Sequence, residues 1–289
     1  MYLAGEYGFE IFSKYIKEDF LDKKRPKKIF HYTNIYGLEN ILKKGFFWVS
    51  DANFLNDKNE IKYTFELSKK IFSSICEERG FSDETTREYN IFFNSMIENN
   101  KNLYSLSFCT NPDSNLLWAN YSQNDGYCIA FDWKGFYKYM DRNEKFLLIP
   151  GYVIYDKNKQ TKKLKNLLND IIDILEEGTH LESKISSAFT ALEFYSLFFK
   201  DRCFSQEEEF RIILYPKVDK ETYKCRISNG TFIPYVETEF DTGSVIGVTI
   251  GPKNNMDINS EGLYKFLHQI KEFDYSKVKI GKSKIPYRF

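Results

Sequence analysis

The chain has 289 residues, 42% of them hydrophobic, which is enough to bury a sizeable core of its own. Its 41 basic and 41 acidic side chains give a formal net charge of zero, which argues against a protein that holds duplex nucleic acid mainly through the phosphates. Five cysteines without a Cys-x-x-Cys pair and three scattered histidines argue against a disulfide framework and a zinc site, so we expect a cytoplasmic protein without a metal.

The sequence also gives no sign of a membrane partner. Residues 1–12 carry Glu6 and Glu10 and lack a basic start followed by an apolar run, so we expect no signal peptide. The longest apolar stretches have the length of a strand and fall short of the ~20 apolar residues that a membrane helix needs. We therefore expect no contact with a membrane.

The first hundred residues predict two strands with helices around them. The strands are expected over 28–33 and 46–50, and the helices over 10–22, 35–44, 60–78 and 82–99. Asn34 precedes the second of these helices and is placed to cap it, and Gly45 follows it as a glycine that ends a helix does.

The remainder of the chain is rich in strands. Residues 103–109 alternate apolar and small side chains, as a half-buried strand does. Further strands are expected over 126–131, 146–155, 208–215, 222–227, 231–236, 245–250 and 277–280. Helices are expected over a short segment that begins at Asp113, over 166–199 and over 261–270. Because strands and helices alternate irregularly, without a βαβ rhythm or a glycine-rich nucleotide motif, we predict a single α+β domain over 1–289. Its sheet is expected to be largely antiparallel, with flanking helices and helical insertions at about 60–100 and 160–200.

Two polar motifs in the first part of the chain are candidates for a site. His31-Tyr32-Thr33 ends the first strand, where a histidine can offer one ring nitrogen as donor and the other as acceptor to a ribose hydroxyl. By position alone, a histidine bonded to the backbone at a strand end is the favoured interpretation. Asn56-Asp57 precedes the helix that starts near Glu60, and capping of that helix is favoured over contact with a ligand.

The segment Glu207-Glu208-Glu209-Phe210-Arg211 is a third candidate. In an extended chain Glu207, Glu209 and Arg211 face one side and Glu208 faces the other. Two carboxylates and a guanidinium on one face can stabilise an oxocarbenium-like centre. A solvated edge strand with a Glu/Arg pair is the simpler alternative.

The middle of the chain adds a helical pair and a cysteine. Trp118 and Tyr121 are three residues apart, so they share a helix face and can stack on a planar ring, although such pairs are more often part of a core. Cys109 lies on an apolar strand with no histidine nearby in sequence, which favours packing over a nucleophile.

The order of these motifs resembles a bacterial family catalogued as domain of unknown function 2971. The resemblance rests on His31-Tyr32-Thr33, on Asn56-Asp57-x-x-Glu60, on Trp118-Ala119-Asn120-Tyr121 and on the segment from Phe204 to Arg211. It runs from about Phe30 to the C-terminus.

The opening of the chain is also similar to the ADP-ribosyltransferase superfamily, since His31-Tyr32-Thr33 is followed by Leu38-x-x-Ile41-Leu42-x-x-Gly45. This resemblance implies a split antiparallel sheet and NAD as a co-substrate, without a metal. By it, His31 holds a ribose hydroxyl, the backbone near Tyr32 and Thr33 holds the nicotinamide amide, and Trp118 or Tyr121 stacks on the ring.

The same resemblance assigns the carboxylates. It implies that Glu209 stabilises the nicotinamide ribose, that Glu207 positions the acceptor and that Arg211 orients both. Ser107 and Tyr121 are competing candidates for the middle position of the superfamily pattern. Asn56 and Asp57 have no counterpart in that pattern, and we include them as candidate cofactor contacts.

We therefore expect an ADP-ribosyltransferase-like enzyme that binds NAD and transfers its ADP-ribose to a protein, a nucleic acid or water. The resemblance implies a toxin or an anti-phage defence effector. The alternative is a non-catalytic module that binds a nucleotide or a protein. A glycosidase or nuclease that uses Glu207 and Glu209 is weaker, because the two carboxylates are too close on one strand to flank a sugar bond and metal ligands are missing.

Overall fold

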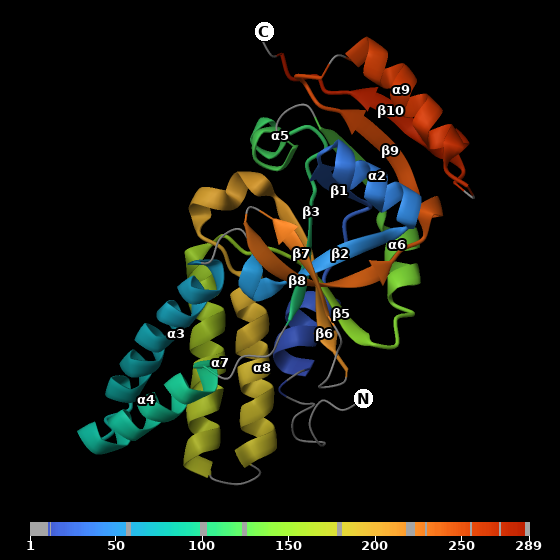
Figure 1. Ribbon diagram of the computed structural model, residues 1–289. Coiled ribbons are helices and arrows are strands. Elements are labelled where there is room, and N and C mark those ends of the chain that lie inside the picture. The colour runs from blue at the N-terminus through green and yellow to red at the C-terminus, as the bar shows by residue number, and fades with distance from the viewer. Residues whose placement is uncertain are drawn as a thin grey trace.

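The structure is a computed structural model of the chain, drawn in Figure 1. It describes residues 11, 13–55, 59–98, 103–122, 126–177, 181–217, 223–228, 230–254, 256–271 and 273–286. The candidate contacts Asn56 and Asp57 lie outside the described residues. Figure 1 shows a twisted sheet in the upper part of the molecule and a group of long helices below it.

The described strands form one sheet, and the pairing is antiparallel except between β9 and β10, which run parallel. The strands are β1 (Lys28–Thr33), β2 (Phe46–Asp51), β3 (Tyr104–Cys109), β4 (Tyr127–Asp132), β5 (Phe146–Tyr152), β6 (Glu209–Pro216), β7 (Lys224–Ser228), β8 (Thr231–Glu239), β9 (Val245–Ile250) and β10 (Lys279–Lys282). Their order is β10-β9-β4-β1-β3-β2-β8-β7, and β6 pairs with both β3 and β5. The prediction of a largely antiparallel α+β fold is confirmed.

The helices surround this sheet and form a bundle beneath it (Figure 1). They are η1 (Ser13–Leu21), α2 (Ile35–Lys44), α3 (Asn59–Glu78), α4 (Asp83–Glu98), α5 (Asn115–Ser122), α6 (Trp133–Met140), α7 (Lys157–Glu177), α8 (Leu181–Phe198) and α9 (Met256–Gln269). Short 3₁₀ turns are η2 (Ala52–Phe54), η3 (Arg202–Glu207), η4 (Thr242–Ser244) and η5 (Tyr275–Lys277). The two stretches expected as helical insertions pack against each other, because α3 and α4 join α7 and α8 in the bundle.

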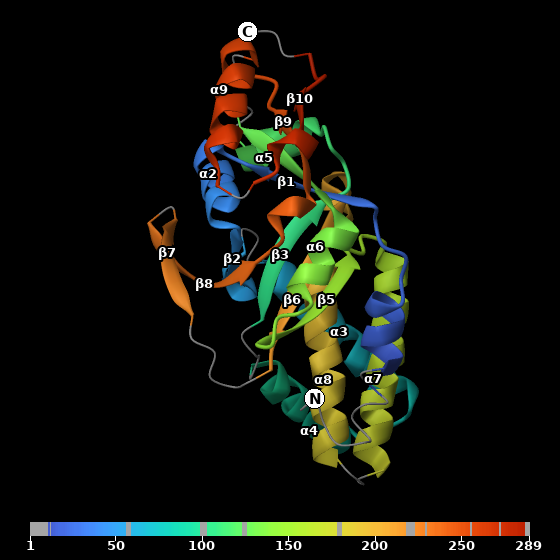
Figure 2. The ribbon, with the colours of Figure 1, turned by 90° about the vertical axis from the view of Figure 1, so that its right-hand side faces the viewer.

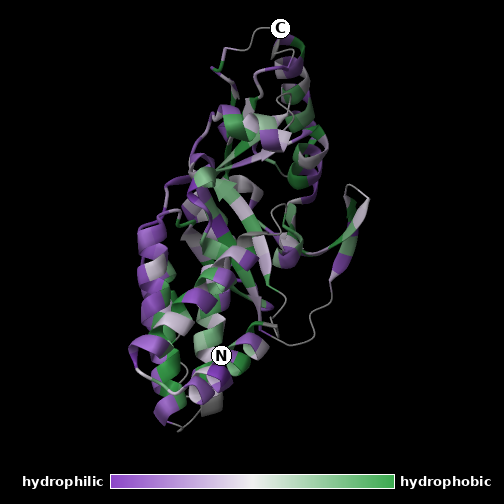
Figure 3. Cartoon of the chain, turned by 90° about the vertical axis from the view of Figure 1, so that its left-hand side faces the viewer, coloured by the Kyte–Doolittle hydropathy of each residue, from purple (hydrophilic) through white to green (hydrophobic). Residues whose placement is uncertain are grey.

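The two faces of the sheet are buried differently. On β3, Tyr104, Leu106 and Phe108 belong to a core that the sheet shares with α2, α6 and α9. A second core joins η1, α3, α7 and α8 to the end of β6. In Figure 3 the outer helices of the bundle carry hydrophilic residues along their outer side and hydrophobic residues toward their neighbours. Ser105 and Ser107 alternate with the apolar residues of β3 and face away from the first core.

The sheet is split beside β3. One edge of β3 pairs with β6 along six residues. The other edge meets β1 only at Phe30↔Cys109, and it meets β2 only through Tyr104 and Ser105. Between these two points no described strand pairs with this edge, so β1 and β2 diverge and leave a wedge between them. A split of this kind leaves backbone N–H and C=O groups without a neighbouring strand, so they need hydrogen-bond partners from side chains, water or a ligand.

Local signals explain where several elements begin and end. Asn34 Oδ1 accepts a hydrogen bond from the Gly37 backbone nitrogen at 2.9 Å, and Gly45 ends α2 with φ of +67° and donates to the Ile41 carbonyl. The predicted bounds of β1 and α2 are therefore confirmed.

Other boundaries were wrong. Helix α7 begins at Lys157, nine residues before the predicted start, because Asp156 Oδ1 accepts from the Lys159 backbone nitrogen and caps it. Helix α6 was not predicted, although Asp132 caps it through the Gly135 backbone nitrogen.

Candidate functional site

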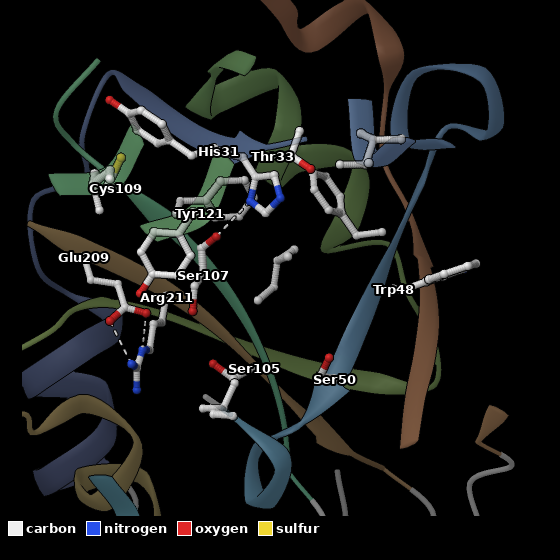
Figure 4. A pocket seen from close by; sticks show the side chains of 18 of the residues that line it. His31, Thr33, Trp48, Ser50, Ser105, Ser107, Cys109, Tyr121, Glu209 and Arg211 are labelled. Atoms are coloured by element: carbon white, nitrogen blue, oxygen red, sulfur yellow. Dashed lines mark hydrogen bonds and ion pairs between the residues drawn. The ribbon is translucent and has the colours of Figure 1, made fainter. Parts of the chain in front are cut away.

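A cavity of about 1060 Å³ occupies the wedge in the sheet. Its walls come from β1, the start of α2, β2, β3, α5, the segment between α8 and β6, and the β7–β8 hairpin. Figure 4 shows side chains from these elements turned toward one space. Most of its lining residues are aromatic or small and polar, and the charged ones are Lys200, Glu207, Glu209, Arg211 and Arg226.

Glu209, the first residue of β6, forms the charged centre of one side. Its Oε1 lies 2.6 Å from Arg211 Nε, its Oε2 lies 2.7 Å from the second guanidinium nitrogen, and Lys200 Nζ is 3.4 Å from Oε2. Burial alone would raise the pKa of Glu209, but the charge and hydrogen bonds of Arg211, with Lys200 and Ser107, lower it to about 2. The carboxylate is therefore ionised at neutral pH, in a pocket where only 8% of the residue is exposed.

Lys200 links the two glutamates. Its Nζ lies 2.6 Å from Glu207 Oε2, and the Tyr121 hydroxyl donates to Glu207 Oε1 at 3.0 Å. The two cations, Lys200 and Arg211, balance the two carboxylates, so this buried network has no net charge. Arg211 also donates to the Leu197 carbonyl at 2.6 Å, which fixes the network to the last turn of α8. Paired and hydrogen-bonded in this way, buried charges are tolerated.

Glu207 reaches this network by a route that differs from the predicted one. It ends the 3₁₀ turn η3, and the strand begins only at Glu209. Glu208 between them adopts the left-handed conformation with φ of +46°, which is uncommon for a residue with a Cβ. The Glu208 carbonyl accepts from the Thr110 backbone nitrogen, and its side chain accepts from Asn111 at 3.0 Å. Glu209 and Arg211 thus share one side of a strand as expected, whereas Glu207 reaches the same network from a 3₁₀ turn and not from the predicted extended chain.

His31 faces the cavity from β1, on the opposite side of the wedge (Figure 4). Its Nδ1 lies 3.1 Å from the Ser107 carbonyl oxygen, one of the backbone groups that the split leaves without a strand partner. A carbonyl can only accept, so Nδ1 carries the hydrogen. Burial lowers the pKa of His31, which keeps the ring neutral and leaves Nε2 as an acceptor. The rings of Phe47 and Phe108 hold the imidazole edge-on at centroid distances of 5.2 and 5.8 Å.

The neighbours of His31 on β1 have different positions. Thr33 lines the cavity next to Gly37, where an added Cβ would come within 1.9 Å of Thr33 Oγ1, so α2 can approach β1 only with glycine there. Tyr32 also borders the cavity, but its hydroxyl donates to the Asn111 carbonyl at 3.0 Å and accepts from the Ser114 backbone nitrogen at 2.9 Å.

The helical pair on α5 is divided between two environments. Tyr121 lines the cavity and is 40% exposed, whereas Trp118 is fully buried and is not among the lining residues. Trp118 Nε1 donates to Asp113 Oδ1 at 2.8 Å, and its ring packs edge-on against Tyr32 at 4.7 Å. Of the two, only Tyr121 is placed to stack on a bound ring.

Ser107 and Cys109 border the cavity from β3. Burial raises the pKa of the Cys109 thiol to about 12, and its Sγ donates to the Asn111 carbonyl at 3.2 Å. A thiol that is protonated and buried is a poor nucleophile, which agrees with the packing role favoured from the sequence.

Sequence reasoning missed Lys200, Ser50, Ser105 and Arg226, all of which line the cavity. Lys200 follows a long apolar helix and lies seven residues before Glu207, which is a weak signal for a buried cation. Arg226 comes from the β7–β8 hairpin, and nothing near it in sequence connects it to the other residues.

Among the described residues, no group of three or more His, Cys, Asp and Glu side chains is arranged to hold a metal ion. None of the described helices combines the length and the apolar composition that crossing a membrane requires.

Comparison with known proteins shows a similarity over part of the chain. Residues 117–212, which are 96 of the 289, match the model of a family described as Protein of unknown function (DUF2971). No curated protein and no solved structure matches the chain. The matched segment contains Trp118, Tyr121 and the stretch from Glu207 to Arg211. It therefore supports the resemblance to this family over a third of the chain, including one charged wall of the cavity.

Proposed function

We propose that the protein is an ADP-ribosyltransferase-like enzyme that binds NAD in the cavity and transfers ADP-ribose to an acceptor or to water. One observation carries this proposal: the acceptor nitrogen of His31 on β1, the ring of Tyr121 on α5 and the carboxylate of Glu209 on β6 border the same cavity. These residues are far apart in sequence, and each offers a different interaction with a ribose that carries a planar base.

The size of the cavity agrees with a dinucleotide. Ligand cavities typically enclose ~300–1,000 Å³, and this one, at about 1060 Å³, is slightly larger than that range. Tyr121 supplies an aromatic surface, and the neutral His31 supplies an acceptor for a ribose hydroxyl.

Glu209 supplies the electrostatic part of the reaction. The bond from ribose C1′ to the nicotinamide nitrogen breaks with both electrons going to nicotinamide, so positive charge develops on the ribose. A carboxylate that is already ionised and held by Arg211 stabilises that charge without reorganising. The attacking atom of the acceptor then bonds to C1′ and releases a proton. Glu207, held by Lys200 and Tyr121, borders the same cavity and is the carboxylate that orients that acceptor.

The test is nicotinamide release from NAD by the purified wild type and by Glu209→Gln, with and without bacterial lysate. Loss of one preorganised electrostatic group typically lowers turnover by about 10²–10³, and we expect a decrease of that size with an NAD affinity that changes only a few-fold. Glu208→Gln is the matched control, since it neutralises the adjacent carboxylate, which bonds to Asn111 and does not line the cavity.

Absence of release by the wild type at high enzyme concentration, with lysate present, would contradict the proposal. Dependence on lysate would show that a protein or nucleic acid accepts ADP-ribose, whereas release without lysate would indicate water. Either outcome bears on the toxin or anti-phage role that the superfamily resemblance implies.

A non-catalytic nucleotide-binding module is the second candidate, and one observation favours it. Every carboxylate oxygen of Glu207 and Glu209 already has a cation or a hydroxyl as partner, so the network can serve the fold alone. Such a module would bind NAD and show no turnover for Glu209→Gln to remove.

A further inference from the structure

A second group of polar side chains lines the cavity away from Glu209. Ser50 on β2 and Ser105 on β3 lie directly opposite each other in the antiparallel pair, so their side chains share one face. Arg226 reaches the same place from β7 and donates to Ser50 Oγ at 3.1 Å. Figure 4 shows Ser50 and Ser105 side by side on neighbouring strands below His31.

These groups offer donors that the protein does not use. Ser105 is only 5% exposed, and its Oγ has no hydrogen-bond partner among the described residues. Arg226 Nε is also buried without a partner, and Arg226 forms no ion pair with any residue that the structure describes. Burial lowers the pKa of Arg226, as expected for a cation without a neighbouring anion. Unpaired buried donors are costly, so their convergence in a cavity indicates a bound acceptor.

The charges near Arg226, Ser50 and Ser105 favour a negatively charged ligand. Glu207 and Glu209 are the acidic residues of the cavity lining, and both are engaged by Lys200. Lys224, the other cation of β7, is paired with Glu237 at 2.6 Å and lies outside the cavity. Among the hairpin residues that the structure describes, Arg226 is therefore the cation that remains available to a ligand.

We infer that Arg226, Ser50 and Ser105 form a subsite for the diphosphate group of a nucleotide. A guanidinium fork matches the oxygens of a phosphate in a bidentate arrangement. Ser50 Oγ accepts from Arg226, which leaves its own hydroxyl hydrogen for the ligand, and the hydroxyl of Ser105 is free to donate as well. This inference rests on the proposed function for the identity of the nucleotide, and it adds the side of the cavity at which the phosphates bind.

The position of the subsite fits a nucleotide whose ribose lies at Glu209. Ser107 lies beside Glu209 and contributes to its low pKa. Ser105 is two residues away on the same strand, a distance of about 7 Å. That distance is comparable with the span from C1′ of a ribose to the phosphate on its 5′ oxygen. The ring packing of Trp48 against Tyr235, at 4.9 Å, holds the hairpin that carries Arg226 against β2.

The test is calorimetric binding of ADP-ribose, a probe that contains the diphosphate and cannot undergo nicotinamide cleavage. Hydrogen bonds to a charged group contribute about tenfold to a hundredfold in affinity, so we expect Arg226→Gln to weaken binding by that factor. We expect Ser105→Ala to weaken it by about threefold to tenfold without lowering the melting temperature, because Ser105 Oγ has no partner to lose in the part of the chain that the structure describes. Lys224→Gln removes a cation from the same strand outside the cavity and should change the affinity by less than twofold.

Two further probes show whether Arg226 recognises the diphosphate or the nucleoside. Adenosine should bind equally to the wild type and to Arg226→Gln, and inorganic pyrophosphate should show the same Arg226 dependence as ADP-ribose with a lower affinity. Equal affinity of wild type and both cavity variants for ADP-ribose, or no binding of any phosphate probe at millimolar concentration, would overturn the inference. Arg226-dependent binding without nicotinamide release would keep the subsite and reject the enzymatic proposal, so the two failures are distinguishable.

Discussion

At the scale of single residues, the charged wall of the cavity depends on a carboxylate with a strongly lowered pKa. The pKa of Glu209 falls from 4.5 to about 2 because Arg211 and Lys200 outweigh the effect of burial. A lowered pKa in the folded state contributes stability above pH 4.5, and that stability is lost as the pH falls toward 2. The contribution is of the order of 3 kcal/mol for a shift of this size.

This difference gives a prediction for Glu209→Gln. We expect the variant to be less stable than wild type at pH 7, and the difference in free energy of unfolding should shrink as the pH falls from 4.5 to 2. Urea unfolding of both proteins across that range measures it. A difference that stays constant with pH would mean that the carboxylate is not held by Arg211 and Lys200 in the folded protein. Glu208→Gln, whose carboxylate lies outside this network, provides the control.

At the scale of elements, the segment that contains Trp118 serves the fold as well as the site. Asp113 Oδ1 accepts from Trp118 Nε1 and from Ser283 Oγ, and its Oδ2 accepts from the Lys284 backbone nitrogen. One carboxylate therefore joins α5 to the chain that follows β10. This attachment orients the face of α5 that carries Tyr121 and borders the cavity.

Removal of that carboxylate should loosen the attachment. We expect Asp113→Ala to lower the free energy of unfolding by about 2–4 kcal/mol, since a buried indole N–H and two further donors lose their partner. Backbone amides of residues 283–285 should exchange hydrogen faster in the variant, which mass spectrometry measures. Unchanged exchange in that segment would show that Asp113 does not hold it. Asp156→Ala, which removes the cap of α7, is a control for a general loss of stability that leaves this segment in place.

The elements also show what the sequence can and cannot predict. The bounds of β1 and α2 followed from local chemistry, because Asn34 and Gly45 are residues with strong preferences at the two ends of a helix. The turn at Glu208 could not be predicted, because glutamate has no preference for positive φ and its contacts come from Thr110 and Asn111, about a hundred residues away. Helical spacing alone predicted that Trp118 and Tyr121 could both stack on a bound ring. The structure distinguishes them, because Trp118 is buried and Tyr121 is exposed.

At the scale of the whole molecule, the site is a product of the sheet order. The wedge exists because β3 meets β1 at one end and β2 at the other, and each meeting involves strands that are distant in sequence. His31, Glu209 and Arg211 were candidates from their residue types and Ser107 from the superfamily resemblance, and all four line the cavity. Figure 2 shows the β7–β8 hairpin standing to one side of the sheet. The sequence contains no signal that the hairpin places Arg226 next to β2. That position depends on the pairing of β8 with β2, in which Tyr235 lies opposite Ser50.

The central claim is that NAD binds in this wedge with its nicotinamide ribose at Glu209, and a crystal structure of Glu209→Gln with NAD tests it most directly. We expect the nicotinamide ribose within hydrogen-bond distance of His31 Nε2 and residue 209, the nicotinamide ring against Tyr121, and the diphosphate at Arg226. NAD bound at another surface, or an empty cavity in crystals grown with millimolar NAD, would contradict the claim.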